Sequence, residues 1–250
     1  MGLFTPAWKG KNEEKALRSV EKITGRKKLA KVAKEAITWR ARKAAVAKLT
    51  HQGLLLDIAM NESEYFVRKA AVANLTDQQS LACVAKNNSD SNIRRAAVAK
   101  LADQRALAFV AKNDGTNYVR EAAVKNLADE SLLADIAKND SDWEVCHAAV
   151  VKLTDPEVLK DIAEKYIANI HALTGDCNKD EWQKVKTLIS IAKKAPQLLK
   201  ENWQQISKVI NGLHEDIHSD DRSKGNWYSS RRHETAASKG LVFPPYPFDD

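Results

Sequence analysis

The chain has 250 residues, 44% of them hydrophobic, so it is long enough to bury a sizeable core. It contains only nine glycines and six prolines and shows almost no alternation of apolar and polar residues, which predicts an all-α protein. No apolar run approaches the ~20 residues of a membrane-spanning helix, and the formal net charge of +7 permits an acidic partner.

Residues 1–12 are expected to form an N-terminal extension, because the periodic apolar residues begin only after them. They lack the long apolar segment of a secretory signal peptide. The three cysteines, Cys83, Cys146 and Cys177, are too few and too scattered for a disulfide framework. We therefore expect a reducing, cytoplasmic location and no membrane partner.

A strict 26-residue repeat occupies residues 13–165. The triplet Ala-Ala-Val recurs at this spacing, at residues 44–46, 70–72, 96–98, 122–124 and 148–150. Self-similarity at such a period is typical of stacked helical repeats, in which each unit contacts only its neighbours. The spacing predicts an α-α superhelix of about five to six two-helix repeats, beginning near Glu13 with a half-repeat.

Each repeat is expected to contain two short helices. The first begins at a capping aspartate, which accepts hydrogen bonds from the N–H groups of the first turn. These aspartates are Asp77, Asp103, Asp129 and Asp155. The second helix spans about residues 118–127 in the fourth unit. Neither helix is long enough to be stable alone, so packing against neighbouring repeats must stabilise both.

An arginine position repeats at the same spacing, and a helical wheel places it toward the stack. It holds Arg42, Arg68, Arg94 and Arg120, with Cys146 in the fifth unit. Six residues before each arginine, except the first, the turn between the two helices carries Glu62, Asn88 or Asp114, and Asp140 stands six residues before Cys146. A buried guanidinium needs acceptors. We therefore predict a structural ladder in which the turn binds the arginine of its own or of the next second helix.

The pattern Asp-x4-Val-Arg-x-Ala-Ala-Val-x2-Leu, complete at residues 114–127, resembles the second half of a HEAT repeat. The short unit is similar to bacterial HEAT-like repeats and to the leucine-rich-variant class, both armadillo-like α-solenoids. The resemblance implies an array that presents a surface to a partner, and it implies no catalytic residue. Because Cys146 replaces the arginine, and Ala36 and Ala41 replace the acid and the valine, we expect the ladder to weaken at both ends.

The resemblance also implies that the exposed arc of the second helices forms the inner surface of the stack. The candidate ligand surface consists of Lys43, Phe66, Lys69, Arg95, Tyr118, Glu121 and His147. It is basic toward the N-terminal half and mixed toward the other half. We interpret it as a groove for a protein or an extended acidic peptide, the alternative being an ordinary solvated face.

The chain beyond the array is expected to change character twice. Residues 166–218 have the apolar spacing of helices that cap the last repeat. Residues 219–250 form a polar tail that ends in aromatics and prolines, a polyproline-like strip expected to dock on the array or on another protein. His214 and His218 have a spacing that can chelate a divalent ion. No third ligand follows them, so we expect no metal and no other cofactor.

The sequence contains no Gly-rich phosphate loop and no nucleophile elbow. Cys146 and His147 are sequence neighbours that point in different helical directions, which is poor geometry for a nucleophile and its base. The chain is therefore interpreted as a non-enzymatic scaffold that binds a protein or peptide. The alternative is a nucleic-acid-binding helical-repeat protein, and the third interpretation is a metal-binding or lyase-like enzyme.

Overall fold

The structure is a computed structural model that describes residues 6–171, 187, 188, 190, 191 and 194. Every regular element in this part of the chain is a helix, which confirms the predicted all-α class. The chain divides into two compact units, Met1–Ile136 and Ala137–Asp250, and each is considered by itself.

Helices of two kinds alternate in the first unit. The first helices of the repeats are α2 (Arg26–Glu35), α4 (Gln52–Asn61), α6 (Gln78–Asn87) and α8 (Gln104–Asn113). The second helices are α3 (Trp39–Val46), α5 (Tyr65–Asn74), α7 (Ser91–Val98) and α9 (Asn117–Asn126). Before them come the 3-10 helix η1 (Ala7–Lys9) and α1 (Glu13–Glu21), and α10 (Glu130–Asn139) follows. Equivalent helices begin 26 residues apart, and α1 begins where a second helix would begin, so the array starts with a half-repeat.

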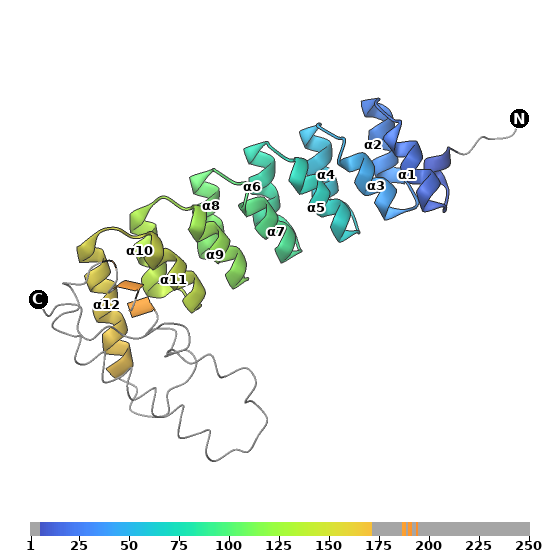
Figure 1. Cartoon of the computed structure of the whole chain (residues 1–250). Coiled ribbons are helices and arrows are strands. Elements are labelled where there is room, and N and C mark those ends of the chain that lie inside the picture. Colours follow the sequence, from blue (N-terminus) through green and yellow to red (C-terminus); the bar gives the residue numbers. More distant parts are fainter. Residues whose placement is uncertain (1–5, 172–186, 189, 192–193, 195–250) are drawn as a thin grey trace, which may run out of the picture. The chain divides into compact units, whose positions relative to one another are not determined.

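The helices of the first unit pack in sequential order. Each first helix lies against the second helix of its own repeat, α3, α5, α7 and α9 pack side by side, and α4, α6 and α8 form a parallel row (Figure 1). This arrangement is an α-α superhelix of repeats. The 3-10 helix η1 packs against α1 and α2 and buries Trp8, so part of the predicted extension belongs to the folded body.

The repeated aliphatic residues form the core. In each Ala-Ala-Val triplet of the first unit the second alanine and the valine are buried, as Ala45 and Val46 show. The large buried side chains come from both helix rows and include Leu55, Leu81 and Leu107 of the first helices and Ile93 of the second helix α7. Since burial of such a side chain stabilises a fold by about 1.5–3 kcal/mol, the periodic core outweighs the low intrinsic stability of ten-residue helices.

Side-chain caps determine where several helices begin. Asp77 accepts a hydrogen bond from the Ser80 N–H at the start of α6, and Asp103 accepts from Arg105 and Ala106 at the start of α8. The first helices α4, α6 and α8 end at an asparagine, and the next residue, such as Glu62 or Asp114, adopts an extended backbone that starts the turn. The acidic turn positions are thus the residues that directly follow these helices.

The second unit contains α11 (Trp143–Lys152) and α12 (Pro156–His171). Helix α12 is longer than the other first helices, as its apolar spacing predicts, and buries Leu159, Ile162 and Tyr166. Most of the predicted capping helices, the histidines His214 and His218, and the tail 219–250 lie outside the described residues. No described helix is both long and apolar enough to cross a membrane.

Candidate binding surface

The second helices of the first unit expose one edge of each repeat. Val67 and Ala71 of α5 are buried. Lys69, which lies between them in the sequence, is on the opposite side of the helix and is exposed. Lys43 on α3 and Arg95 on α7 occupy the equivalent position and are also exposed. Three predicted cations therefore form one row, with neighbours separated by about 10 Å, the usual distance between packed helices.

Beside this row lies an aromatic cluster formed by Trp39, Tyr65 and Phe66. The Trp39 and Phe66 rings, from adjacent repeats, stack with centroids 5.2 Å apart and planes inclined by 24°. Tyr65 meets Phe66 edge-on at 5.3 Å. Phe66 is nevertheless 50% exposed. Of these three residues only Phe66 was predicted from the sequence, although residues 39 and 65 are equivalent in the repeat and both aromatic.

Two cations of the row lie over the aromatic cluster. Lys43 Nζ is 6.0 Å from the Phe66 centroid, and Lys69 Nζ is 5.8 Å from the Tyr65 centroid. No carboxylate in the described part of the chain forms an ion pair with Lys43, Lys69 or Arg95. We refer to these three cations and the aromatic cluster together as the basic face.

Arg40 also belongs to this side of α3, but its charge is compensated. Its guanidinium lies 4.7 Å from the Trp39 ring and donates to both carboxylate oxygens of Glu13 at 2.8 and 2.7 Å. The Glu13–Arg40 pair closes the N-terminal end of the basic face. Arg40 therefore helps to hold Trp39 and adds little net charge.

The remaining predicted ligand residues have different surroundings. The Arg95 guanidinium lies 5.3 Å from the Tyr118 ring, and the Tyr118 hydroxyl hydrogen-bonds Ser91. Glu121 pairs with Lys125 at 2.5 Å. His147 belongs to the second unit, where its ring lies 6.1 Å from that of Trp143. The structure thus groups Lys43, Phe66 and Lys69 and connects Arg95 to Tyr118, whereas His147 contacts Trp143 within the second unit.

The arginine ladder lies behind the basic face and joins consecutive repeats. Arg94 donates to the backbone carbonyls of Asn88 and Ser89 in its own turn, at 3.0 and 3.3 Å. It also forms a bidentate pair with Asp114, at 2.7 and 2.8 Å. Arg42 binds the carbonyl of Ala36 and pairs with Glu62 in the same manner. The carboxylate partner therefore lies twenty residues after the arginine, in the next repeat, and the arginine's own turn contributes carbonyls.

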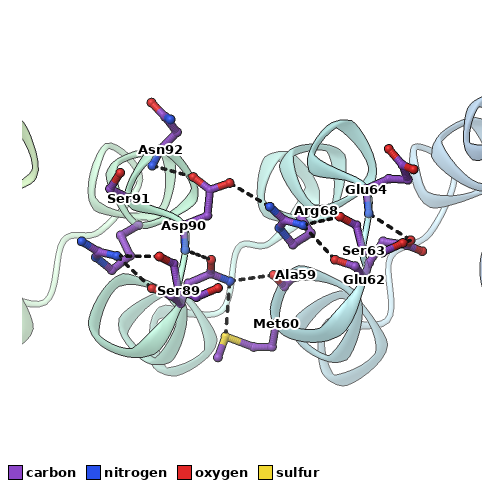
Figure 2. A network of polar contacts seen from close by, with 12 residues as sticks. Ala59, Met60, Glu62, Ser63, Glu64, Arg68, Ser89, Asp90, Ser91 and Asn92 are labelled. Atoms are coloured by element: carbon purple, nitrogen blue, oxygen red, sulfur yellow. Dashed lines mark hydrogen bonds and ion pairs between the residues drawn. The ribbon is translucent and has the colours of Figure 1, made fainter.

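One ladder position lacks its acid, and a neighbouring residue replaces it. Asn88 occupies the acidic position, and Arg68 pairs instead with Asp90, two residues later, at 2.7 Å (Figure 2). The Asn88 amide donates to the Ala59 carbonyl, and its oxygen accepts from the Asp90 N–H. Asp90 contacts only one terminal nitrogen of Arg68, and the buried Arg68 Nε has no hydrogen-bond partner among the described residues.

The ladder changes the protonation behaviour of its acids. Burial raises the pKa of Asp114, but hydrogen bonds from Arg94 and from the Thr116 N–H outweigh it, so the pKa is lowered overall. The pKa values of Glu62 and Asp90 are also lowered overall. Burial raises the pKa of each, but hydrogen bonds from Arg42 to Glu62, from Arg68 to Asp90 and from nearby backbone N–H groups outweigh burial. The charged forms of all three acids are thus stabilised by folding.

At each end of the array, the arginine position of the ladder and the acid position that would pair with it are both occupied by neutral residues. At the N-terminal end Ala16 and Ala36 occupy the arginine and acid positions, and both are buried. In the second unit Cys146 and Tyr166 occupy them. Burial raises the pKa of the Cys146 thiol and of the Tyr166 hydroxyl, so both stay neutral, and the hydroxyl donates to the Ala137 carbonyl at 2.5 Å. All four of these residues are neutral, so none of them requires an ion-pair partner.

A second periodic contact, between lysine or asparagine side chains and backbone carbonyls of the preceding repeat, was not predicted from the sequence. Residues 48, 74, 100 and 126, all lysine or asparagine, donate to the carbonyls that end the preceding second helix. Lys100, for example, binds the carbonyls of Val72, Ala73 and Leu75. Burial of the Lys100 ammonium lowers its pKa. The strict alternation of Lys and Asn before each repeated leucine was the available signal.

The first helices carry a separate row of contacts on the opposite side of the repeat. Lys34 pairs with Asp57 at 3.0 Å, and Lys112 pairs with Asp135 at 3.1 Å. At the equivalent place Lys86 lies 4.9 Å from the ring of Phe109, which is 49% exposed. Phe109 therefore resembles Phe66 in exposure and in its lysine neighbour, but it lies on a first helix, away from the basic face.

No family model, no curated protein and no solved structure matches the chain. The class of the protein accordingly rests on its own helix packing, which is that of a helical-repeat solenoid. The more specific HEAT-like type stays a prediction from the repeat residues.

Proposed function

We propose that the chain is a non-enzymatic interaction scaffold whose basic face binds an extended, acidic segment of a protein. The observation that carries this proposal is the half-exposed Phe66 ring, which stacks on Trp39 of the neighbouring repeat beside cations that form no ion pair with a carboxylate of the described residues. A HEAT-like assignment of the array supports it, because arrays of that type present surfaces to partners.

The aromatic cluster has the character of an interface anchor. Aromatic side chains dominate binding energy at protein interfaces because they bury a large area and are already rigid. Trp39, Tyr65 and Phe66 are held in place by one another and by Arg40. A partner that covers Phe66 would therefore gain apolar contact while losing little conformational entropy.

The row of cations favours a peptide over a nucleic acid. Lys43, Lys69 and Arg95 stand about 10 Å apart, a distance that an extended peptide covers in about three residues. Phosphates of a single strand are spaced more closely than the cations of this row. In addition, Trp39 already covers one face of the Phe66 ring, which leaves less of it for base stacking.

A selection experiment on the full-length chain tests the proposal. A displayed library of random peptides is selected on the wild-type protein, and bound sequences are compared with those recovered on Phe66→Ala and on the matched control Phe109→Ala. We expect wild type and Phe109→Ala to enrich the same acidic sequences containing aromatics or prolines, and Phe66→Ala to lose them.

Two results would overturn the proposal. One is enrichment that is equal on Phe66→Ala and on wild type, because the basic face would then not be the binding site. The other is tighter binding of oligothymidylate than of any selected peptide, with an affinity that falls steeply with salt, which identifies a nucleic-acid-binding protein instead.

A further inference from the structure

Arg95 is the arginine among the three cations of the basic face, and a neighbouring helix holds its side chain. Its guanidinium lies over the Tyr118 ring of α9, 5.3 Å from the ring centroid. The Tyr118 hydroxyl in turn hydrogen-bonds Ser91, the first residue of α7, which is the helix that carries Arg95. Ser91 and Arg95 are four residues apart and therefore lie on one side of α7. The ring is thus held from two helices and gives the guanidinium a fixed surface.

The acids of the α9 segment are paired with other cations. Asp114, in the turn before α9, forms its bidentate pair with Arg94. Glu121, on α9 itself, pairs with Lys125. Arg95 is exposed and forms no ion pair with a carboxylate of the described residues. Its guanidinium is therefore positioned, but its N–H donors lack an anionic acceptor in this part of the chain.

We infer that Arg95 binds one aspartate or glutamate side chain of the bound segment in a bidentate pair, and that Tyr118 and Ser91 are positioning residues that orient its guanidinium. The inference rests on the proposed function, because it names the chemical group that this surface recognises in its partner. A guanidinium presents parallel N–H donors that match the two oxygens of a carboxylate. The ammonium groups of Lys43 and Lys69 are point charges on flexible stems and impose no such geometry.

The hold on Arg95 lowers the cost of binding a carboxylate. An exposed arginine side chain loses rotamer freedom when it forms a pair of fixed geometry. Contact with the Tyr118 ring already restricts that freedom in the unbound protein. The ring also offers the guanidinium no competing acceptor, since its hydroxyl is engaged with Ser91. More of the interaction with the partner's carboxylate therefore contributes to affinity.

A double-mutant cycle on the full-length chain tests the inference. The peptide most enriched on wild type is synthesised with each acidic residue replaced in turn by its amide. Every peptide is titrated against wild type, Arg95→Lys and the control Lys69→Arg. Arg95→Lys keeps the charge but loses the bidentate geometry, so we expect about a tenfold loss of affinity. This loss should disappear for the one peptide that lacks the acid bound by Arg95. Lys69→Arg should change affinity by less than about threefold.

The positioning residues are tested with the same peptides. Tyr118→Leu removes the ring, so we expect it to weaken binding about threefold and to reduce the advantage of arginine over lysine at position 95. Tyr118→Phe keeps the ring and removes only the bond to Ser91, so its loss should be smaller. Adding Ser91→Ala to Tyr118→Phe should weaken binding no further, because both changes remove the same bond. An unchanged advantage of arginine over lysine in Tyr118→Leu would show that Tyr118 does not orient Arg95.

Two further results would overturn the inference. One is wild-type affinity of Arg95→Lys, and the other is an equal loss of affinity in Arg95→Lys for every amide-substituted peptide, because Arg95 would then bind no particular carboxylate. Both results leave the proposed function intact if Phe66→Ala still abolishes enrichment. A library that yields no peptide on wild type would instead contradict the proposed function itself.

Discussion

At the scale of single residues, Arg68 shows how a repeat accommodates a substitution at a ladder position. Its guanidinium is mostly buried and needs an anionic acceptor. Asn88 cannot provide one, and Asp90 supplies the charge from two residues farther along. Asp90 also accepts from the Asn92 N–H and so caps α7. A single carboxylate therefore pairs with a cation and begins a helix.

Exchanging the two residues tests this account. Asp90→Asn keeps a good capping residue but leaves Arg68 without its anion, so we expect a loss of about 3 kcal/mol, seen as a lower urea midpoint. Adding Asn88→Asp moves the acid to the position that Glu62 and Asp114 occupy. The double variant should recover most of the loss, because a bidentate pair can then form.

The same measurement on an exposed pair provides the control. Glu121→Gln breaks the Glu121–Lys125 pair, whose lysine side chain is 61% exposed, and should cost less than about 1 kcal/mol. If Asp90→Asn costs no more than this control, or if Asn88→Asp fails to restore stability in the double variant, the arginine pair does not stabilise the array.

At the scale of helices, the second helices depend on one another at their C-terminal ends. Each is only eight to ten residues long in the first unit, and the last carbonyls of a helix have no partner within it. Lys100 satisfies three such carbonyls at the end of α5, and Asn74 binds those of Val46 and Leu49 after α3. The following repeat thus completes the helix before it.

Lys100 offers a direct test of this dependence. Lys100→Met keeps the aliphatic length but removes every donor, so we expect the free energy of unfolding to fall by about 2 kcal/mol. Lys100→Asn should cost less than half as much, because asparagine performs the same task at positions 74 and 126. Equal losses in the two variants, measured by urea denaturation, would show that the carbonyl contacts contribute nothing specific.

The helices were predictable from the sequence because their signals are local and repeated. Capping aspartates such as Asp77, the apolar spacing of Leu81 and Val84, and the 26-residue period together locate each pair of helices. The ladder was predicted only in outline. The six-residue spacing suggested that a turn binds the arginine of its own or of the next second helix, whereas the carboxylate of the turn pairs with the arginine of the preceding second helix. The alternation of lysine and asparagine marked the position of Lys100 but not its acceptors, which lie in the previous repeat.

The binding surface was less predictable for a related reason. Phe66 breaks the repeat and could be identified by that break, but its environment depends on Trp39 in the neighbouring repeat. The compensation of Arg40 by Glu13 likewise joins two residues from different helices. Which cations keep an unbalanced charge is therefore decided by packing between repeats and not by composition.

At the scale of the whole molecule, stability should depend on pH through the ladder acids. Glu62, Asp90 and Asp114 have pKa values lowered by folding, so the unfolded chain takes up protons first as the pH falls. Their contribution is complete above the unfolded pKa values of about 4 and is lost as the pH falls through the lower folded values.

The urea midpoint should therefore be nearly the same at pH 7 and pH 5 and should decrease below about pH 4. An Asp114→Asn variant, already missing one of these carboxylates, should lose less of its remaining stability on acidification than wild type does. A midpoint that declines steadily between pH 7 and pH 5, or an identical acid response of the variant, would contradict this origin of the pH dependence.

Residues that repeat every 26 positions and residues that differ between repeats have different roles in the array. The periodic residues build and connect the repeats, through the aliphatic core, the arginine ladder and the capping lysines and asparagines. Among the residues that differ between repeats, Phe66 and the aromatic starts of α3 and α5 lie on the exposed face of the second helices. Recognition of a partner is thus proposed for residues that lie outside the periodic core and the arginine ladder.

Charge reversal on this face tests the proposed function most directly. The affinity of a library-selected peptide is measured by titration calorimetry for full-length wild type and for the triple variant Lys43→Glu/Lys69→Glu/Arg95→Glu. The control is Lys27→Glu/Lys28→Glu/Lys31→Glu on α2, which makes the same change in net charge on exposed residues of a first helix. We predict at least a tenfold loss of affinity for the first variant, equivalent to about 1.4 kcal/mol, and a much smaller loss for the control. Equal affinities of the two variants would contradict a binding site on the second helices.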